Sequence, residues 1–196
     1  DGDLSGSSVS LSANGTRLAI GAPGNDDNGI TAGHVRVYQW TGSTWSQLGA
    51  DIDGEAFDDQ SGEVSLSADG NILAIGAPMN DDNGNLSGHV RIYAWNGAAW
   101  TQLGQDIDGE AVEDQSGRVS LSAAGSRIAI GAPYNVSNGG FNGPGHVRVY
   151  QWNGLAWVQL GQDINGEING DAFGITVNLS SDGNRMAVGA IYHDGS

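Results

Sequence analysis

The stretch Val64-Ser65-Leu66-Ser67-Ala68-Asp69-Gly70-Asn71-Ile72-Leu73-Ala74-Ile75-Gly76-Ala77-Pro78 decides the fold of this chain. Its first four residues alternate apolar and polar side chains, Asp69-Gly70 is a two-residue turn signal, and an apolar run follows. This pattern predicts an antiparallel hairpin of two short strands. Because Asp-Gly tolerates positive φ at both central positions of a tight turn, we expect that turn type here.

The same pattern occurs four times, so this is a repeat protein. Copies of the opening Val begin at Val9, Val64, Val119 and Val177, and the Gly-Ala-Pro ending recurs in the first three copies. The repeats span residues 9–63, 64–118, 119–176 and 177–196, and the fourth is truncated. A repeat is interrupted at both ends, which predicts that the sequence is an excerpt of a longer one.

A second hairpin follows the first in each copy. In the second repeat, a polar loop leads into the alternating segment 89–95, and Asn96-Gly97 turns the chain into the segment 100–103. Four antiparallel strands with two apolar sheet faces are the unit of a β-propeller. We therefore predict an all-β fold, a partial propeller of about three and a half four-stranded blades that forms one domain over 1–196. A straight β-solenoid is the alternative, but its rungs are usually shorter and lack paired hairpin turns.

Composition and charge exclude several classes of protein. The hydrophobic content of 38% and six Trp indicate a folded chain, and 33 Gly favour turns and short strands over helices. The net charge of −16 excludes nucleic acid as a partner, because a phosphate backbone would be repelled. The absence of Cys excludes disulfides and thiolate metal sites. No apolar run has the length of a transmembrane segment.

The repeat resembles a known family. The Ser-Gly or Phe-Gly segment before the first strand, the Gly-Ala-Pro ending of the second and the phrase Gly-His-Val-Arg-Val-Tyr in the third are similar to FG-GAP repeats, the blades of integrin-α-type propellers. They are closest to tandem repeats in large secreted or surface proteins of marine bacteria and microalgae. The resemblance covers the whole chain, although only Phe173-Gly174 keeps the name-giving Phe. It implies an extracellular or cell-surface location.

Acidic residues after the fourth strand are candidate calcium ligands. They alternate near a glycine, as oxygens do in a calcium loop, but the full ligand series is missing. The alternative is that they cap turns and accept backbone N–H bonds between blades. The candidates are Asp51, Asp53, Glu55, Asp106, Asp108 and Glu110. The calcium loop of integrin-type blades lies between the first two strands, where this chain has a single carboxylate in 68–71, so that site is not expected here.

The loops before the third strands offer a second set of candidates. As a ligand-binding surface they would contribute Asn25, Asp26, Asp27, Asn80, Asp81 and Asp82, while the alternative is a solvated polar loop. Four asparagines stand in Asn-x-Ser/Thr sequons and are candidate glycosylation sites, namely Asn14, Asn85, Asn135 and Asn178.

A histidine recurs at one strand position as His34, His89 and His146, each two residues before an Arg. Because blade rotation carries such copies apart, we expect them to pair with acids of an adjacent blade and not to form a catalytic or zinc centre. The paired Trp residues of each repeat are expected in the core, and a carbohydrate-stacking platform is the alternative.

No nucleophile or acid pair stands out from the repeat, so the sequence predicts that the chain is not an enzyme. We predict a non-catalytic extracellular protein for adhesion, binding or structure. The alternatives are a lectin-like carbohydrate-binding propeller and a subunit of an extracellular filament or matrix. Its partners would be a protein or glycan ligand, or further copies of the chain, and calcium is the one cofactor indicated.

Overall fold

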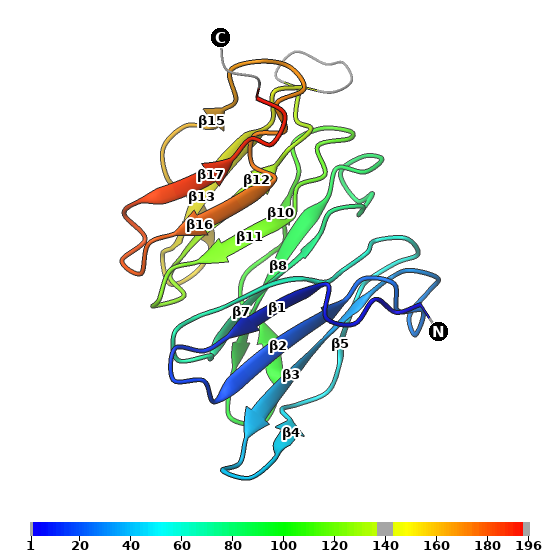
Figure 1. Ribbon diagram of the computed structural model, residues 1–196, viewed down its shortest axis with the longest axis vertical. Helices are drawn as coiled ribbons and strands as arrows, with labels where there is room; N and C mark the ends of the chain where they lie inside the picture. Colours follow the sequence, from blue (N-terminus) through cyan, green and yellow to red (C-terminus); the bar gives the residue numbers. More distant parts are fainter. Residues whose placement is uncertain (1, 137–142, 194–196) are drawn as a thin grey trace.

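The structure is a computed structural model that describes residues 2–136 and 143–193. Its regular elements are β-strands, arranged in three sheets of five strands and one sheet of two. The sheets lie side by side in chain order, from the blue N-terminal sheet to the orange and red C-terminal one (Figure 1). Within the described residues, no helix has the length and apolar character needed to cross a membrane.

Each sheet is built from one repeat, and all its neighbouring strands are antiparallel. The first contains β1 (Ser8–Leu11), β2 (Arg17–Ala22), β3 (His34–Trp40), β4 (Trp45–Gln47) and β5 (Ile52–Asp53). The second contains β6 (Glu63–Leu66), β7 (Ile72–Ala77), β8 (His89–Trp95), β9 (Trp100–Gln102) and β10 (Ile107–Asp108). The third contains β11 (Arg118–Leu121), β12 (Arg127–Ala132), β13 (His146–Trp152), β14 (Trp157–Gln159) and β15 (Ile164–Asn165), and the fourth β16 (Thr176–Leu179) and β17 (Met186–Gly189).

The predicted all-β partial propeller is confirmed, with one addition to each full blade. Besides the four expected strands, the acidic segment after the fourth strand forms a short fifth strand that pairs with the third strand. In the second blade, Trp95 of β8 lies opposite Trp100 of β9, while His89 at the other end of β8 lies opposite Asp108 of β10. The fifth strand therefore carries carboxylates back to the start of the third strand.

The turn of the first hairpin differs from its predicted type. Gly70 has a φ of 71°, but Asp69 is not among the residues with positive φ. The N–H of Gly70 donates to the carbonyl of Ser67, and Asp69 Oδ1 accepts bonds from the Ser67 hydroxyl and the Asn71 N–H. The carboxylate itself closes the turn and only the glycine needs the left-handed conformation. The expectation of positive φ at both positions was wrong.

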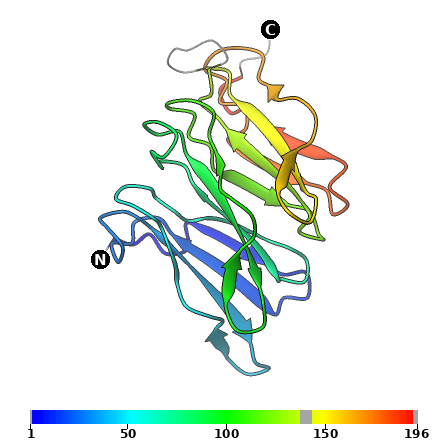
Figure 2. The same ribbon diagram turned by 180° about the vertical axis from the view of Figure 1, so that it is seen from behind.

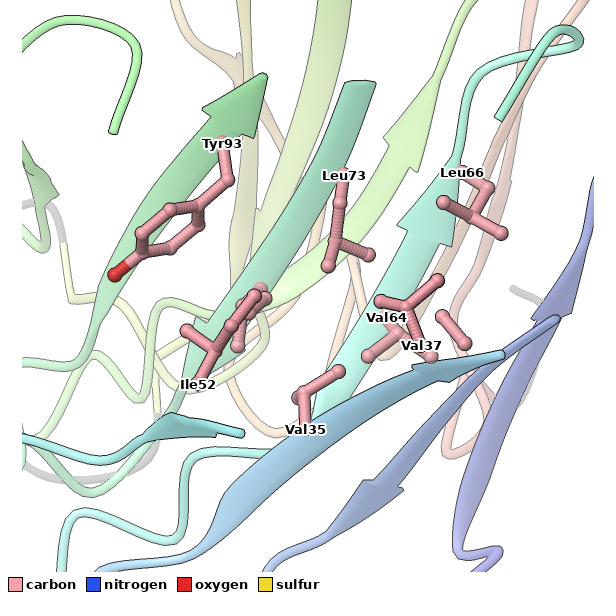
Figure 3. Packing of buried hydrophobic residues seen from close by; sticks show 9 residues of the cluster. Val35, Val37, Ile52, Val64, Leu66, Leu73 and Tyr93 are labelled. Carbon is pink, nitrogen blue, oxygen red and sulfur yellow. The ribbon is translucent and has the colours of Figure 1, made fainter. Parts of the chain in front are cut away.

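The hydrophobic core lies between the sheets. Leu73 and Ile75 of β7 belong to one cluster with Val35 of the first blade, as Figure 3 shows for the labelled residues. Ala74, which lies between them in β7, belongs to a second cluster with Ile130 of the third blade. Because successive side chains of a strand point to opposite faces, one strand contributes to two cores. Both faces of the sheet are apolar, as predicted.

The first strands of neighbouring blades are joined by hydrogen bonds to serine hydroxyls. The N–H groups of Val64 and Leu66 donate to the side chains of Ser8 and Ser10, at 3.1 and 2.9 Å. The same bond joins Leu121 to Ser65 and Leu179 to Ser120. The serines of the alternating pattern thus satisfy donors on the edge strand of the next blade, which would otherwise be unpaired. Figure 2, seen from behind, shows that the blades follow one another without a break.

The second strand approaches the next blade closely at Gly76. A Cβ at this position would lie 1.9 Å from the carbonyl oxygen of Gly117, in the segment that leads into the third blade. Gly21 and Gly131 make the equivalent approach to Gly62 and Gly174. A glycine is required at this position because any side chain would push the two blades apart.

Replacing a side chain of the inter-blade core tests how much the packing contributes. Ile130 is fully buried, so Ile130→Ala is expected to lower the free energy of unfolding by about 2–5 kcal/mol. Leu155→Ala removes a side chain that is 87% exposed and is expected to change it by less than about 0.5 kcal/mol. Urea denaturation followed by Trp fluorescence measures both, and equal effects would contradict a core between blades.

The close approach of Gly76 is tested by a single added methyl group. Gly76→Ala is expected to destabilise the chain by more than about 2 kcal/mol, since the methyl group meets a backbone carbonyl that cannot rotate away. Gly97→Ala is the control, because a Cβ there meets no atom within 4 Å and only its φ of 99° adds strain of about 1 kcal/mol. Thermal unfolding compares them, and an equal loss at the two positions would count against the contact.

Candidate functional site

A charged cluster crosses the boundary between the second and third blades. Arg148 Nη1 lies 3.6 Å from Glu110 Oε1, and His146 Nδ1 lies 3.8 Å from Glu110 Oε2. Arg148 Nη2 also donates to the backbone carbonyl of Asp108 at 2.6 Å. His146 and Arg148 are buried, whereas the Glu110 side chain is 43% exposed. The expected pairing with an acid of the adjacent blade is confirmed for Arg148, whereas His146 lies near Glu110 at a distance longer than a hydrogen bond.

The second blade repeats this arrangement with the acid from the first repeat. Arg91 Nη1 lies 3.5 Å from Glu55 Oε1, His89 Nε2 lies 3.8 Å from Glu55 Oε2, and Arg91 Nη2 donates to the carbonyl of Asp53. In the first blade, Arg36 instead pairs with Asp51 of its own repeat at 2.7 Å. The hydrogen bond from Arg36 lowers the pKa of Asp51.

In the described residues, His89 and His146 are neutral and lack hydrogen-bond partners at ring nitrogens. Burial lowers the pKa of His89 and of His146, so both rings are uncharged at pH 7. Within the described part of the chain, neither ring nitrogen of His89 has a hydrogen-bond partner, nor does Nε2 of His146. Among residues 2–136 and 143–193, three histidines have potential metal-ligand atoms of two acids within 4.8 Å. The three clusters are Asp27, His34 and Asp51; Glu55, Asp82 and His89; and Glu110, His146 and Asp163.

The structure divides the predicted calcium ligands among blades. Asp51, Glu55 and Glu110 each belong to a different histidine cluster, while Asp53, Asp106 and Asp108 lie outside all three. Calcium at these six residues stays a prediction. The expected capping role is found in buried acids of the same segments, since Asp59 and Asp114 each accept two backbone N–H bonds.

A cleft of about 690 Å³ opens beside the third blade. It brings the acidic segment after β9 against β13 and β14, and its functional side chains are Asp106, Asp108, Glu110, Arg148, Tyr150 and Trp157. The Arg148 guanidinium lies over the ring of Tyr150, 5.6 Å from its centroid. Burial raises the pKa of Asp108 and that of Tyr150. The cleft therefore combines a carboxylate of increased basicity, a fixed cation and aromatic faces.

The tryptophans lie at the blade boundaries, where their burial differs. The indole N–H of Trp157 donates to the carbonyl of Leu103 in the second blade, at 2.9 Å, and Trp100 makes the equivalent bond to Leu48. Both are partly buried and pack against the clusters, whereas Trp45 of the first blade is 40% exposed. The expected core position is therefore found only for the side chains that the preceding blade covers.

In the loops before the third strands, buried residues that hold the loop lie next to exposed residues. Asn25 and Asn80 are buried and hydrogen-bonded, Asn25 to the Asp27 N–H and Asn80 to Asp59 at 3.3 Å, and ligand binding at them stays a prediction. Asp26 and Asp81 accept backbone N–H bonds of their own loops. The exposed acids left for binding are Asp27 and Asp82, each in a histidine cluster. This grouping was not predicted from the sequence. The available signal was that Asp27 and Asp82 occupy the same position of the repeat, as do the histidines beside them.

One candidate glycosylation site is blocked. Asn135 is 5% exposed and its amide nitrogen donates to Asp114 Oδ2 at 3.0 Å, so a glycan cannot be attached in the folded chain. The third residue of this sequon, Ser137, lies outside the described residues. The other three asparagines, Asn14, Asn85 and Asn178, are exposed.

The sequence matches no protein family and no curated protein, whereas the fold has many solved counterparts. One is a protein from Bacteroides uniformis that has been assigned as a 6-phosphogluconolactonase. It is 14% identical in sequence, with a TM-score of 0.59, and the match covers 91% of this chain and 45% of that protein. A second protein, from Bacteroides fragilis, has the same assignment. It is 12% identical, with a TM-score of 0.57, and the match covers 92% of this chain and 46% of that protein. The β-propeller domain of the Trilobed protease from Pyrococcus furiosus is 11% identical, with a TM-score of 0.53 over 91% and 47%. The chain spans less than half the length of each of these three proteins.

These matches show the β-propeller fold and correct the functional prediction. Solved structures similar to this chain carry the name of an enzyme, so the prediction of a non-catalytic adhesion, binding or structural protein is contradicted, and so is the prediction that the chain is not an enzyme. The physical reason is that recurrence does not exclude catalysis. Copies of one residue can have different neighbours, as Arg36 and Arg148 do, and one copy can line a cleft.

The indole bond across the blade boundary has a measurable contribution. Trp157→Phe keeps most of the aromatic packing but leaves the Leu103 carbonyl unsatisfied, which is expected to lower the free energy of unfolding by about 1–2 kcal/mol. Trp45→Phe is the matched control, since no such bond of Trp45 occurs in the described residues. Equal denaturation midpoints for the two variants would contradict a role for this bond.

Proposed function

We propose that the chain is part of a hydrolytic propeller whose cleft beside the third blade binds a sugar lactone and opens its ester bond with water. The observation that carries this proposal is the cleft itself, in which Asp108, Arg148, Tyr150 and Trp157 face one space of about 690 Å³. The volume lies in the range of small-molecule sites. The named enzymes with the same fold support the reaction class.

The proposed reaction assigns a role to each side chain. Asp108, with its raised pKa, accepts a proton from a water molecule as the water oxygen forms a bond to the lactone carbonyl carbon. The guanidinium of Arg148, held by Glu110 and by the Asp108 carbonyl, stabilises the negative charge that develops on the carbonyl oxygen. The bond between the carbonyl carbon and the ring oxygen then breaks, and the ring oxygen takes the proton. The product is an open-chain hydroxy acid.

The charge of the cleft favours an uncharged sugar lactone over a phosphorylated one. Asp106, Asp108 and Glu110 face a single guanidinium, that of Arg148, so the lining carries excess negative charge. The chain as a whole has a net charge of −16. A phosphate group would be repelled by both, whereas sugar rings stack on aromatic faces such as those of Trp157 and Tyr150.

We also propose that the repeats are related to FG-GAP repeats. The contact between Gly76 and Gly117 joins the Gly of the Gly-Ala-Pro segment to the Gly of the Ser-Gly segment in the next repeat. The two phrases that resemble FG-GAP repeats are thus one inter-blade contact. This contact supports our proposal that the repeats are of the FG-GAP-like class.

Lactone hydrolysis is tested by acid release. With glucono-1,5-lactone as the probe, the chain is expected to release acid faster than buffer alone, and Asp108→Asn is expected to lower the rate by about 10²–10⁴-fold, because Asn cannot accept the proton. A pH indicator follows the reaction in weak buffer, with the 6-phosphate of the lactone as a poorer substrate.

The matched control is Asp53→Asn, which alters the copy of Asp108 in the first repeat and does not line this cleft. It is expected to keep the full rate. A wild-type rate no faster than buffer would reject the proposal, and an Asp108→Asn rate equal to that of wild type would reject the assigned base.

A further inference from the structure

Each full blade surrounds one histidine with carboxylates from three positions of the repeat. His34, His89 and His146 begin their third strands, and each ring lies at the end that the fifth strand approaches. The acids of the three clusters come from the loop before the third strand (Asp27, Asp82), from the segment after the fourth strand (Asp51, Asp163) and from the end of the preceding repeat (Glu55, Glu110).

The three blades reach the same composition with different members of this set. Each cluster contains one imidazole and two carboxylates, but the first uses both acids of its own repeat, the second uses Glu55 and Asp82, and the third uses Glu110 and Asp163. The repeat therefore keeps two acids next to the histidine, although the positions that supply them change.

In the second cluster, His89 Nε2 faces the acids and has no hydrogen-bond partner among the described residues. His89 is fully buried, and its Nε2 lies 3.8 Å from Glu55 Oε2. This distance is too long for a hydrogen bond. It suits two ligands of one ion, which at bond lengths of about 2.0–2.2 Å lie up to about 4 Å apart. The other oxygen of Glu55 faces Arg91, so Oε2 remains free for the ion.

We propose that Glu55, Asp82 and His89 bind a divalent transition-metal ion of the zinc or manganese class, and that the two other clusters are copies of this site. An imidazole nitrogen beside two carboxylates suits these ions, whereas calcium takes oxygen ligands alone. The side chains of Asp82 and Glu55 are exposed and can turn toward the ion. In the first blade, the ion pair of Asp51 with Arg36 competes with the metal and makes that copy the weakest.

The site shares Glu55 with the predicted calcium ligands but adds an imidazole to the carboxylates, and it does not depend on lactone hydrolysis. The metal site is tested by measuring bound metal, whereas lactone hydrolysis is tested by measuring activity. A negative result for one proposal therefore leaves the other unaffected. Only Glu110 of the third copy belongs to both the cleft and a cluster.

The test uses Co²⁺ as a visible probe for zinc-class sites. After treatment with a chelator and dialysis, the chain is titrated with Co²⁺, and retained metal is counted by elemental analysis. We expect ligand-field absorption, displacement by Zn²⁺ and no displacement by equal Ca²⁺. Asp82→Asn, which changes an exposed acid, is expected to lose one ion per chain, and so is His89→Gln if its circular dichroism shows that it folds.

Glu167→Gln is the matched control. Glu167 is the copy of Glu55 and Glu110 at the end of the third repeat, it is exposed, and it belongs to none of the three clusters. This variant is expected to retain as much Co²⁺ as wild type. Wild-type chain that retains no Co²⁺, Ca²⁺ that displaces it equally well, or an unchanged count in Asp82→Asn would each overturn the proposal.

Discussion

The second and third sheets of this protein have two apolar faces, and each of these faces packs against a neighbouring blade. Strand β7 shows this most directly, because Leu73 and Ile75 contribute to one core and Ala74 to the next. A single sheet with such faces would expose both to water, so the hydrophobic effect stabilises the repeat only in a stack. The close approach at Gly76 and the serine bonds between first strands follow from this packing.

The same stacking explains where the charged residues meet. The segment after the fourth strand must run from one blade to the next, and on the way it forms the fifth strand and ends beside the histidine and arginine of the following blade. Glu55 and Glu110 are therefore exposed acids that lie over buried basic side chains of another repeat. A shared boundary produces both the cleft beside the third blade and the histidine clusters of the second and third blades.

Burial separates residues that look equivalent in the loops. Asn80 and Asp82 are two positions apart, yet the first is enclosed and hydrogen-bonded to Asp59, while the second remains exposed next to His89. A polar sequence such as Asn-Asp-Asp-Asn does not reveal which members hold the loop and which face solvent. The same limitation applies to Asn135, whose sequon predicts an accessible side chain that the structure encloses.

The sequence alone determined the repeat, its four main strands and the apolar character of both sheet faces, because alternation and turn residues are local signals. It also predicted the pairing of histidine and arginine with acids of the adjacent blade. Only the tertiary structure decided the fifth strand, the turn geometry at Asp69, and the meeting of Asp82 with Glu55 and His89. These depend on which blade lies beside which, and a contact between residues 34 positions apart, such as Glu55 and His89, has no local sequence signal.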